Sequence, residues 1–169
     1  MSGDGSSQEL ARSAIDRIGD RWEAGWSGGG RDDFALCCTV DVRYEDPLTA
    51  EPLEGVDALE RHAQRFRRAF PDLRVERAGA RINEGHNACL PWRVVGTQTG
   101  NLGEIPATNR FLTLHGLHYV ELRDDLICRA RGFFDLYDAA TQLGVLPKSG
   151  SFAQSALLML RGFGLRVRS

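Results

Sequence analysis

Residues 110–137 read RFLTLHGLHYVELRDDLICRARGFFDLY, and this segment carries the clearest indication of the fold class. Side chains alternate in character before and after Asp124-Asp125, which predicts two strands, 110–123 and 126–137, joined by a tight turn. Strands connected in this way run antiparallel, so the stretch indicates a meander with one face on a hydrophobic core.

The segments before this meander complete the fold prediction. Apolar residues recur at helical spacing in three early segments, roughly 10–26, 32–38 and 56–70. Further strands are expected at 40–45, 73–82 and 87–98, and a short helix near 139–143 closes the domain. Three helices followed by a meander predict an α+β domain, with the helices packed on one face of a curved antiparallel sheet.

The 169 residues predict one domain with two flanking segments. Residues 1–7 are rich in Gly, Ser and Asp and are expected to be disordered, and the domain covers residues 8–147. Residues 148–169 read as a hinge and an amphipathic helical tail. Three roles for this tail stay open: docking on the domain or on a partner subunit, covering a pocket, or contacting an anionic membrane surface.

Composition excludes several classes of function. The net charge of −2 gives no basic footprint for nucleic acid. No apolar run is long enough for a membrane span, and the N-terminus lacks the apolar core of a signal peptide, so we expect a cytoplasmic protein. The four cysteines and four histidines fit no metal-ligand spacing, so no metal site is expected.

Two carboxylates lie at the end of the strand 40–45. Alternation places Glu45 and Asp46 on opposite faces of the sheet, so one side chain points inward. A carboxylate at the mouth of an apolar cavity has a raised pKa, which suits a general base for a carbon-bound proton. Alternatively, Asp46 caps the turn before Pro47.

The strand 110–123 carries two histidines on opposite faces, His115 and His118, each among apolar neighbours. Either is a satisfied core residue or a donor to a substrate carbonyl or enolate. Asp135 follows the last strand, where it either pairs with an arginine or acts as an acid at the open end of the sheet. Trp22 and Trp92 are expected in the pocket wall or the core.

The segment Val42–Leu48, followed by Glu51–Gly55, resembles the E-D-P segment of ketosteroid isomerases. In that family the Asp of this segment moves the proton between carbons, so the resemblance implies that role for Asp46. The segments His86–Cys89 and Pro91–Val94 are similar to the mid-sheet strand of the same family.

The second half of the chain resembles the SnoaL-like polyketide cyclases. The similar segments are Trp92–Gly100, Ile105–Arg110, Phe133–Asp135 and Gln142–Pro147. Both families belong to the nuclear-transport-factor-two-like superfamily, and the resemblance spans residues 8–147. It implies a cone-shaped, cystatin-like α+β barrel with a buried pocket, and a homodimer formed through the exposed face of the sheet.

The chain departs from both families at the residues that matter for their chemistry. Trp22 stands where ketosteroid isomerases have a Tyr, and His118 stands where they have an Asp. Gly132 stands where SnoaL-like cyclases have an Asp, and Asp135 follows three residues later. Neither mechanism transfers intact, which leaves the substrate open.

The resemblance implies a cofactor-independent isomerase or polyketide cyclase that moves protons on an apolar, steroid-like or polyketide-like carbonyl compound, with lyase or epoxide hydrolase as variants. Asp46 is expected to act as base, His118 to hold the oxyanion, and Asp135 to return the proton. The residues expected to bind substrate are Trp22, Tyr44, Trp92, His115 and Phe134. The alternative is a non-catalytic ligand-binding or dimerisation module of the same fold.

Overall fold

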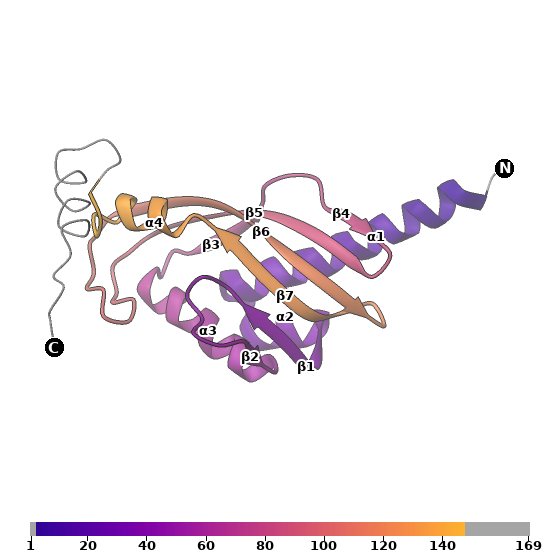
Figure 1. Ribbon diagram of the computed structural model, residues 1–169, viewed down its shortest axis with the longest axis horizontal. Coiled ribbons are helices and arrows are strands. Elements are labelled where there is room, and N and C mark those ends of the chain that lie inside the picture. The colour runs from indigo at the N-terminus through magenta and orange to yellow at the C-terminus, as the bar shows by residue number, and fades with distance from the viewer. Residues whose placement is uncertain (1–2, 148–169) are drawn as a thin grey trace, which may run out of the picture.

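A computed structural model describes residues 3–147 of the chain, and the side chains of residues 14–147 (Figure 1). The helices are α1 (Gly3–Ala24), α2 (Gly30–Cys37), α3 (Val56–Ala69) and α4 (Leu136–Gln142), and a π-helical stretch, η1 (Gly25–Gly29), joins α1 to α2. The strands are β1 (Cys38–Glu45), β2 (Leu53–Glu54), β3 (Arg74–Arg77), β4 (Ile82–Glu84), β5 (Asn87–Thr97), β6 (Phe111–Arg123) and β7 (Leu126–Phe134).

Glycines set the boundaries between the early helices. Gly28 has φ of 135°, a conformation that L-residues with a Cβ rarely adopt, and the chain turns there from α1 into α2. Gly55, with φ of 82°, precedes α3 in the same way. The helix α1 begins at Gly3, within the segment 1–7 whose composition predicts disorder.

Across the described residues, the strands form one sheet in the order β2-β1-β7-β6-β5-β3, and β4 also pairs with β5. The predicted hairpin is confirmed: Asp124 and Asp125, both with positive φ, form the two-residue connection between β6 and β7. The prediction of a purely antiparallel sheet is wrong in one respect, because β1 runs parallel to β7. No short turn links these two strands, so alternation could not indicate their relative direction.

Two predicted strands end early for identifiable reasons. The expected strand 73–82 divides into β3 and β4, and in between, the fully buried side chain of Arg81 forms ion pairs with Asp20 and Glu23 on α1. The expected strand 126–137 ends at Phe134, because Asp135 caps α4. Burial and capping therefore override the alternating pattern at both places.

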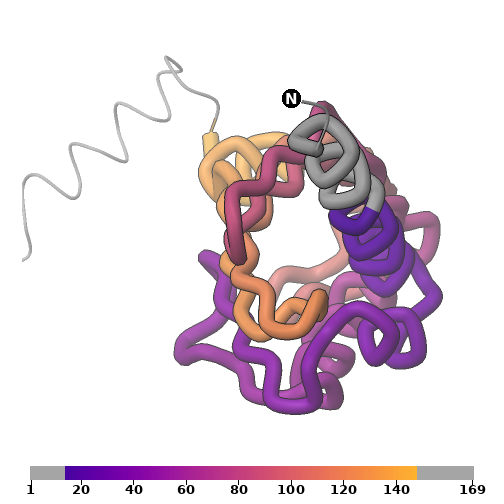
Figure 2. Tube along the Cα trace, turned by 90° about the vertical axis from the view of Figure 1, so that its right-hand side faces the viewer, coloured from indigo at the N-terminus to yellow at the C-terminus, as the bar shows by residue number. Residues whose placement is uncertain are grey.

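The helices α1, α2 and α3 cover one face of the sheet, and in the turned view the strands curve around the opposite side (Figure 2). One core cluster joins these helices to the middle of the sheet around Trp22, Phe34, Val42 and Leu59. A second cluster lies toward α4. The predicted α+β cone is confirmed. Within the described residues, none of the helices combines the length and apolar character that crossing a bilayer requires.

Candidate functional site

An apolar cavity of about 140 Å³ lies between α3, α4 and the inner face of β5 and β6. The loop after β5 contributes Leu102 and Ile105 to its wall. The wall consists of hydrocarbon side chains except for three nitrogen-bearing rings, those of Trp26, Trp92 and His118. A cavity of this kind favours a ligand of about one or two rings and offers it few polar groups.

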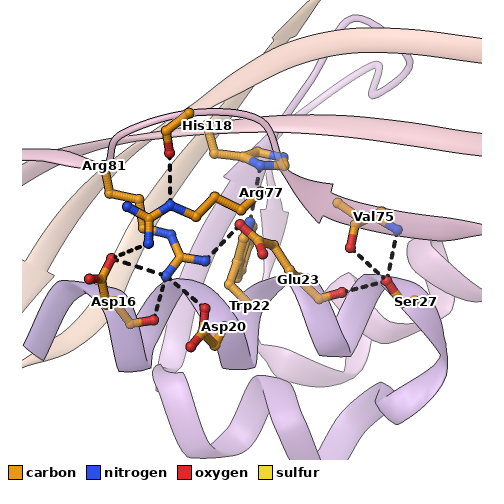
Figure 3. A network of polar contacts seen from close by, with 10 residues as sticks. Asp16, Asp20, Trp22, Glu23, Ser27, Val75, Arg77, Arg81 and His118 are labelled. Atoms are coloured by element: carbon orange, nitrogen blue, oxygen red, sulfur yellow. Dashed lines mark hydrogen bonds and ion pairs between the residues drawn. The ribbon is translucent and has the colours of Figure 1, made fainter. Parts of the chain in front are cut away.

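His118 is the titratable side chain in this wall. It points inward from β6, is 4% exposed, and its Nδ1 lies 3.1 Å from the Nε1 of Trp22 on α1 (Figure 3). An indole N–H only donates, so Nδ1 accepts and the ring proton of neutral His118 is on Nε2. Burial lowers the pKa of His118 to about 3, and the imidazole is therefore neutral at physiological pH.

Tyr44 connects His118 to a carboxylate behind the cavity wall. Its hydroxyl lies 3.5 Å from the Nε2 of His118 and donates to the Oδ2 of Asp46 at 3.0 Å. Burial, together with the Asp46 charge, raises the pKa of Tyr44 well above its ordinary value. The hydroxyl therefore keeps its proton and bridges the two groups.

Asp46 is fully engaged in hydrogen bonds. Oδ2 also lies 2.8 Å from the Nε2 of His62 on α3, and Oδ1 accepts the backbone N–H of Leu48 at 2.7 Å. Burial alone would raise the pKa of Asp46, but hydrogen bonds from His62, Leu48 and Tyr44 and the attraction of His62 hold it below its ordinary value. The expectation of a raised pKa is therefore wrong, because partners outweigh desolvation.

Asp46 caps a turn with one carboxylate oxygen and directs the other inward. Its Oδ1 contact with Leu48 closes the turn around Pro47, as a capping residue would. Its Oδ2 faces the interior, whereas the neighbouring Glu45 binds Arg129 and Arg131 on the other face of the sheet. The predicted separation of the two carboxylates onto opposite faces is confirmed.

Gly132 on β7 leaves room for this cluster. A Cβ there would lie 2.9 Å from the Tyr44 hydroxyl, 3.2 Å from the Asp46 Cβ and 3.4 Å from the His118 Cδ2. The space beside Gly132 is therefore filled by Tyr44 from β1, by Asp46 directly after it, and by His118 from β6. Tyr44, Asp46 and Trp22 lie behind the cavity wall and do not line it.

The remaining predicted residues divide into two groups. Trp92 and Phe134 line the cavity, with ring centroids 6.0 Å apart. His115 is exposed on the outer face of β6. Asp135 is exposed, and its Oδ1 accepts the backbone N–H of Asp138 at 2.9 Å, so it caps α4 in place of the expected pairing with an arginine. The structure does not bring Asp135 or His115 to the cavity.

His62 is the functional candidate that the sequence interpretation missed. It lies three residues after Leu59 and four before Phe66, on the apolar stripe of α3, and its side chain is 3% exposed. A histidine on the buried stripe of a helix was the available signal. Within the described residues, no three His, Cys, Asp or Glu side chains are arranged to hold a metal ion.

Comparison with known proteins identifies the family. The sequence profile of the SnoaL-like polyketide cyclases matches residues 16–143. TsrD from Streptomyces laurentii superposes with a TM-score of 0.72 at 21% identity, over 80% of this chain and 98% of that one. A protein from Jannaschia sp. CCS1, named as a SnoaL-like polyketide cyclase, superposes with a TM-score of 0.69 at 22% identity, over 80% and 92%.

A protein from Catenulispora acidiphila with a ketosteroid isomerase-like fold superposes with a TM-score of 0.64 at 15% identity, over 75% of this chain and 92% of that one. At these identities the structural likeness shows the fold alone. No curated protein matches the chain. The resemblance inferred from sequence is confirmed.

Proposed function

Because the chain belongs to the SnoaL-like polyketide cyclase family, we propose that it is a cofactor-independent enzyme of the isomerase or cyclase type. Its substrate is an apolar carbonyl compound, on which it moves a proton. One observation carries the proposal: the neutral His118 lies in the wall of an apolar cavity and is connected through Tyr44 to the buried carboxylate of Asp46.

His118 is the oxyanion donor in this proposal. The substrate carbonyl shares the Nε2–H of His118 with the Tyr44 hydroxyl, which lies 3.5 Å from Nε2, and the hydrocarbon wall excludes water from that contact. When the adjacent C–H bond breaks, negative charge develops on the carbonyl oxygen, and a fixed donor in a dry site stabilises that charge more than the ground state. Trp92 and Phe134 hold the ring system of the substrate.

Asp46 is the proton acceptor and acts through Tyr44. In the proposed step the wall beside His118 opens so that the substrate carbon reaches Tyr44, whose hydroxyl oxygen takes the carbon-bound proton while its own proton passes to the Oδ2 of Asp46, 3.0 Å away. The C–H electrons form the enolate. Return of the proton at a different carbon gives an isomer, and attack of the enolate carbon on a second carbonyl gives a ring.

The lowered pKa keeps the carboxylate of Asp46 ionised at neutral pH, so it is ready to take up a proton. The family match favours a polyketide-like substrate over a steroid-like one. Asp135 and His115 have no part in this scheme, since neither borders the cavity.

A non-catalytic ligand-binding module is the second candidate. The observation that favours it is the shielding of Asp46, whose side chain is 2% exposed and lies behind the wall. A binding module would hold the same ligand without moving its protons. Proton exchange therefore distinguishes the two functions.

We further propose that the protein is a homodimer formed through the outer face of the sheet. Pro91, Leu117 and Phe133 are cross-strand neighbours on β5, β6 and β7 and form an apolar row on that face. Leu117 is 37% exposed and Phe133 51%. A two-fold axis at this row would let the same patch cover itself, as isologous interfaces require.

The experiment that tests the proposed activity is exchange of the α-protons of 1-indanone in D₂O, followed by proton NMR. We expect the wild-type protein to accelerate the exchange. The catalysed rate should be about 10²–10⁴-fold lower with Asp46→Asn than with the wild type. Asp135→Asn is the matched control, since asparagine also caps helices and Asp135 is exposed. Binding without exchange would favour the ligand-binding module.

A further inference from the structure

His118 has polar partners on both ring nitrogens, and both favour the same tautomer. Among the described residues these partners are the Nε1 of Trp22 at 3.1 Å and the hydroxyl of Tyr44 at 3.5 Å. The indole can only donate. The hydroxyl proton of Tyr44 is used on Asp46, which leaves its oxygen to accept. Nδ1 therefore accepts, and Nε2 carries the proton.

We propose that Trp22 is a positioning residue that fixes His118 in the Nε2–H tautomer, whose proton makes only a long contact with Tyr44, at 3.5 Å, and is shared with the acceptor oxygen of a ligand in the cavity. In the opposite tautomer the proton would be on Nδ1, so that the N–H groups of Trp22 and His118 would point at each other. The buried indole would then have no acceptor, and buried unpaired donors are unfavourable. The ligand class rests on the proposed function, whereas the tautomer does not.

Trp22 is held in place on two sides. Its side chain is fully buried, and its ring packs edge-on against Phe34 and His118, with centroids 5.4 and 5.2 Å away. On α1, the buried guanidinium of Arg81 contacts Asp20 and Glu23, each at 2.8 Å (Figure 3). These ion pairs flank Trp22 along the helix and anchor that segment to the β3–β4 connection.

Trp26 offers a matched comparison within the same cluster. Its ring stacks on His118 at a centroid distance of 5.8 Å and an angle of 16°. Its Nε1 has no hydrogen-bond partner among the described residues. Trp22→Phe and Trp26→Phe therefore each remove an indole that contacts His118, but Trp22→Phe alone removes a hydrogen bond to the imidazole.

The direct test is nitrogen-15 NMR of the His118 ring. We expect the wild-type spectrum to show a protonated Nε2 and an unprotonated, hydrogen-bonded Nδ1. In Trp22→Phe the Nδ1 resonance should move toward that of a free lone pair or of exchanging tautomers, and in Trp26→Phe it should stay. Disappearance of the signals in His118→Gln identifies them among the four histidines. Should Trp22→Phe not fold, 3-benzothienylalanine at position 22 keeps the ring shape and removes only the donor.

Three bicyclic probes test the selection of ligands. Indane has no polar atom, indole has a donor, and 1-indanone has an acceptor. We expect the wild-type protein to bind 1-indanone about 3- to 10-fold more tightly than indane, the range that one net hydrogen bond supplies, and indole no more tightly than indane. The 1-indanone preference over indane should shrink in Trp22→Phe.

Either of two results would overturn the proposal: an unchanged Nδ1 resonance in Trp22→Phe, or a wild-type preference for indole equal to that for 1-indanone. Both readouts are independent of turnover. A protein that shows the expected tautomer and ligand preference but no α-proton exchange would contradict the proposed function and leave the role of Trp22 intact.

Discussion

The Nε2 of His62 lies 2.8 Å from the Oδ2 of Asp46, and the two side chains are only 3% and 2% exposed. This contact joins α3 to the end of β1 and places a buried carboxylate directly behind the cavity wall. Removing one partner of such a pair leaves the other group buried without its main interaction. The pair therefore contributes both to the stability of the fold and to the low pKa of Asp46.

We expect His62→Ala to lower the free energy of unfolding by about 3–5 kcal/mol, since Asp46 would keep its charge in a buried site with one fewer partner. The same variant should raise the pKa of Asp46, because the hydrogen bond from His62 lowers it. Urea unfolding and carboxyl carbon-13 NMR measure the two effects. His86→Ala removes an exposed histidine and is the control. Equal stability of the two variants would contradict a structural role for the pair.

Gly132→Ala should disturb the cluster directly. The new Cβ would lie 2.9 Å from the Tyr44 hydroxyl, closer than carbon and oxygen normally approach, so the side chains must shift. We expect a loss of about 1–3 kcal/mol in the free energy of unfolding. Gly79→Ala is the control, because a Cβ there would have only ordinary contacts, at 3.9 Å or more from Pro91. Similar stability losses in both variants would argue against tight packing at Gly132.

The stability of the protein should depend on pH through His118. Its pKa is about 3 in the fold and about 6.5 in the unfolded chain, so the unfolded chain binds the extra proton between these values. Stability therefore rises with pH up to about 6.5 and is lost as the pH falls below it. Because of this group, we expect the free energy of unfolding to be about 2–3 kcal/mol smaller at pH 4.5 than at pH 7.5.

The matched variant for this pH dependence is His118→Gln, which keeps an acceptor for Trp22 but does not titrate. Carboxylates titrate in both proteins, so the difference between them isolates His118. The free energy of unfolding of the wild-type protein minus that of His118→Gln should be larger at pH 7.5 than at pH 4.5. Parallel stability curves over this range would show that His118 is not buried in its neutral form.

Leu117→Arg tests the proposed dimer, since it places a charge in the middle of the apolar row on the outer face of the sheet. We expect it to shift the protein from dimer to monomer in analytical ultracentrifugation, because an unpaired charge is unfavourable in a buried interface. Val40→Arg is the control, at a β1 side chain that is 87% exposed. A wild-type monomer, or a Leu117→Arg dimer as stable as that of the control, would contradict this interface.

Periodicity was sufficient to predict much of the fold and part of the site. Alternation along 110–123 correctly put His118 and His115 on opposite faces of the sheet, although His115 was expected to bind substrate and is exposed, and it separated Asp46 from Glu45. These assignments succeed because side-chain direction in a strand depends only on local backbone geometry.

Contacts between distant segments were not predictable in this way. The partners of Asp46 and His118 come from α3 and α1, 16 and 96 residues away along the chain. The direction of the Asp46 pKa shift depends on those partners, so reasoning from burial alone predicted the wrong sign. Similarly, the parallel pairing of β1 with β7 depends on the path of the whole chain.

In the proposed mechanism Tyr44 joins the cavity to Asp46, and a double-mutant cycle on α-proton exchange tests this link most directly. Tyr44→Phe and Asp46→Asn are each expected to slow the exchange of 1-indanone by about 10²-fold or more, and the double variant should be no slower than the slower single variant. This result would show that the two residues act as one unit. Independent effects that multiply in the double variant, or wild-type exchange no faster than the uncatalysed rate, would contradict it.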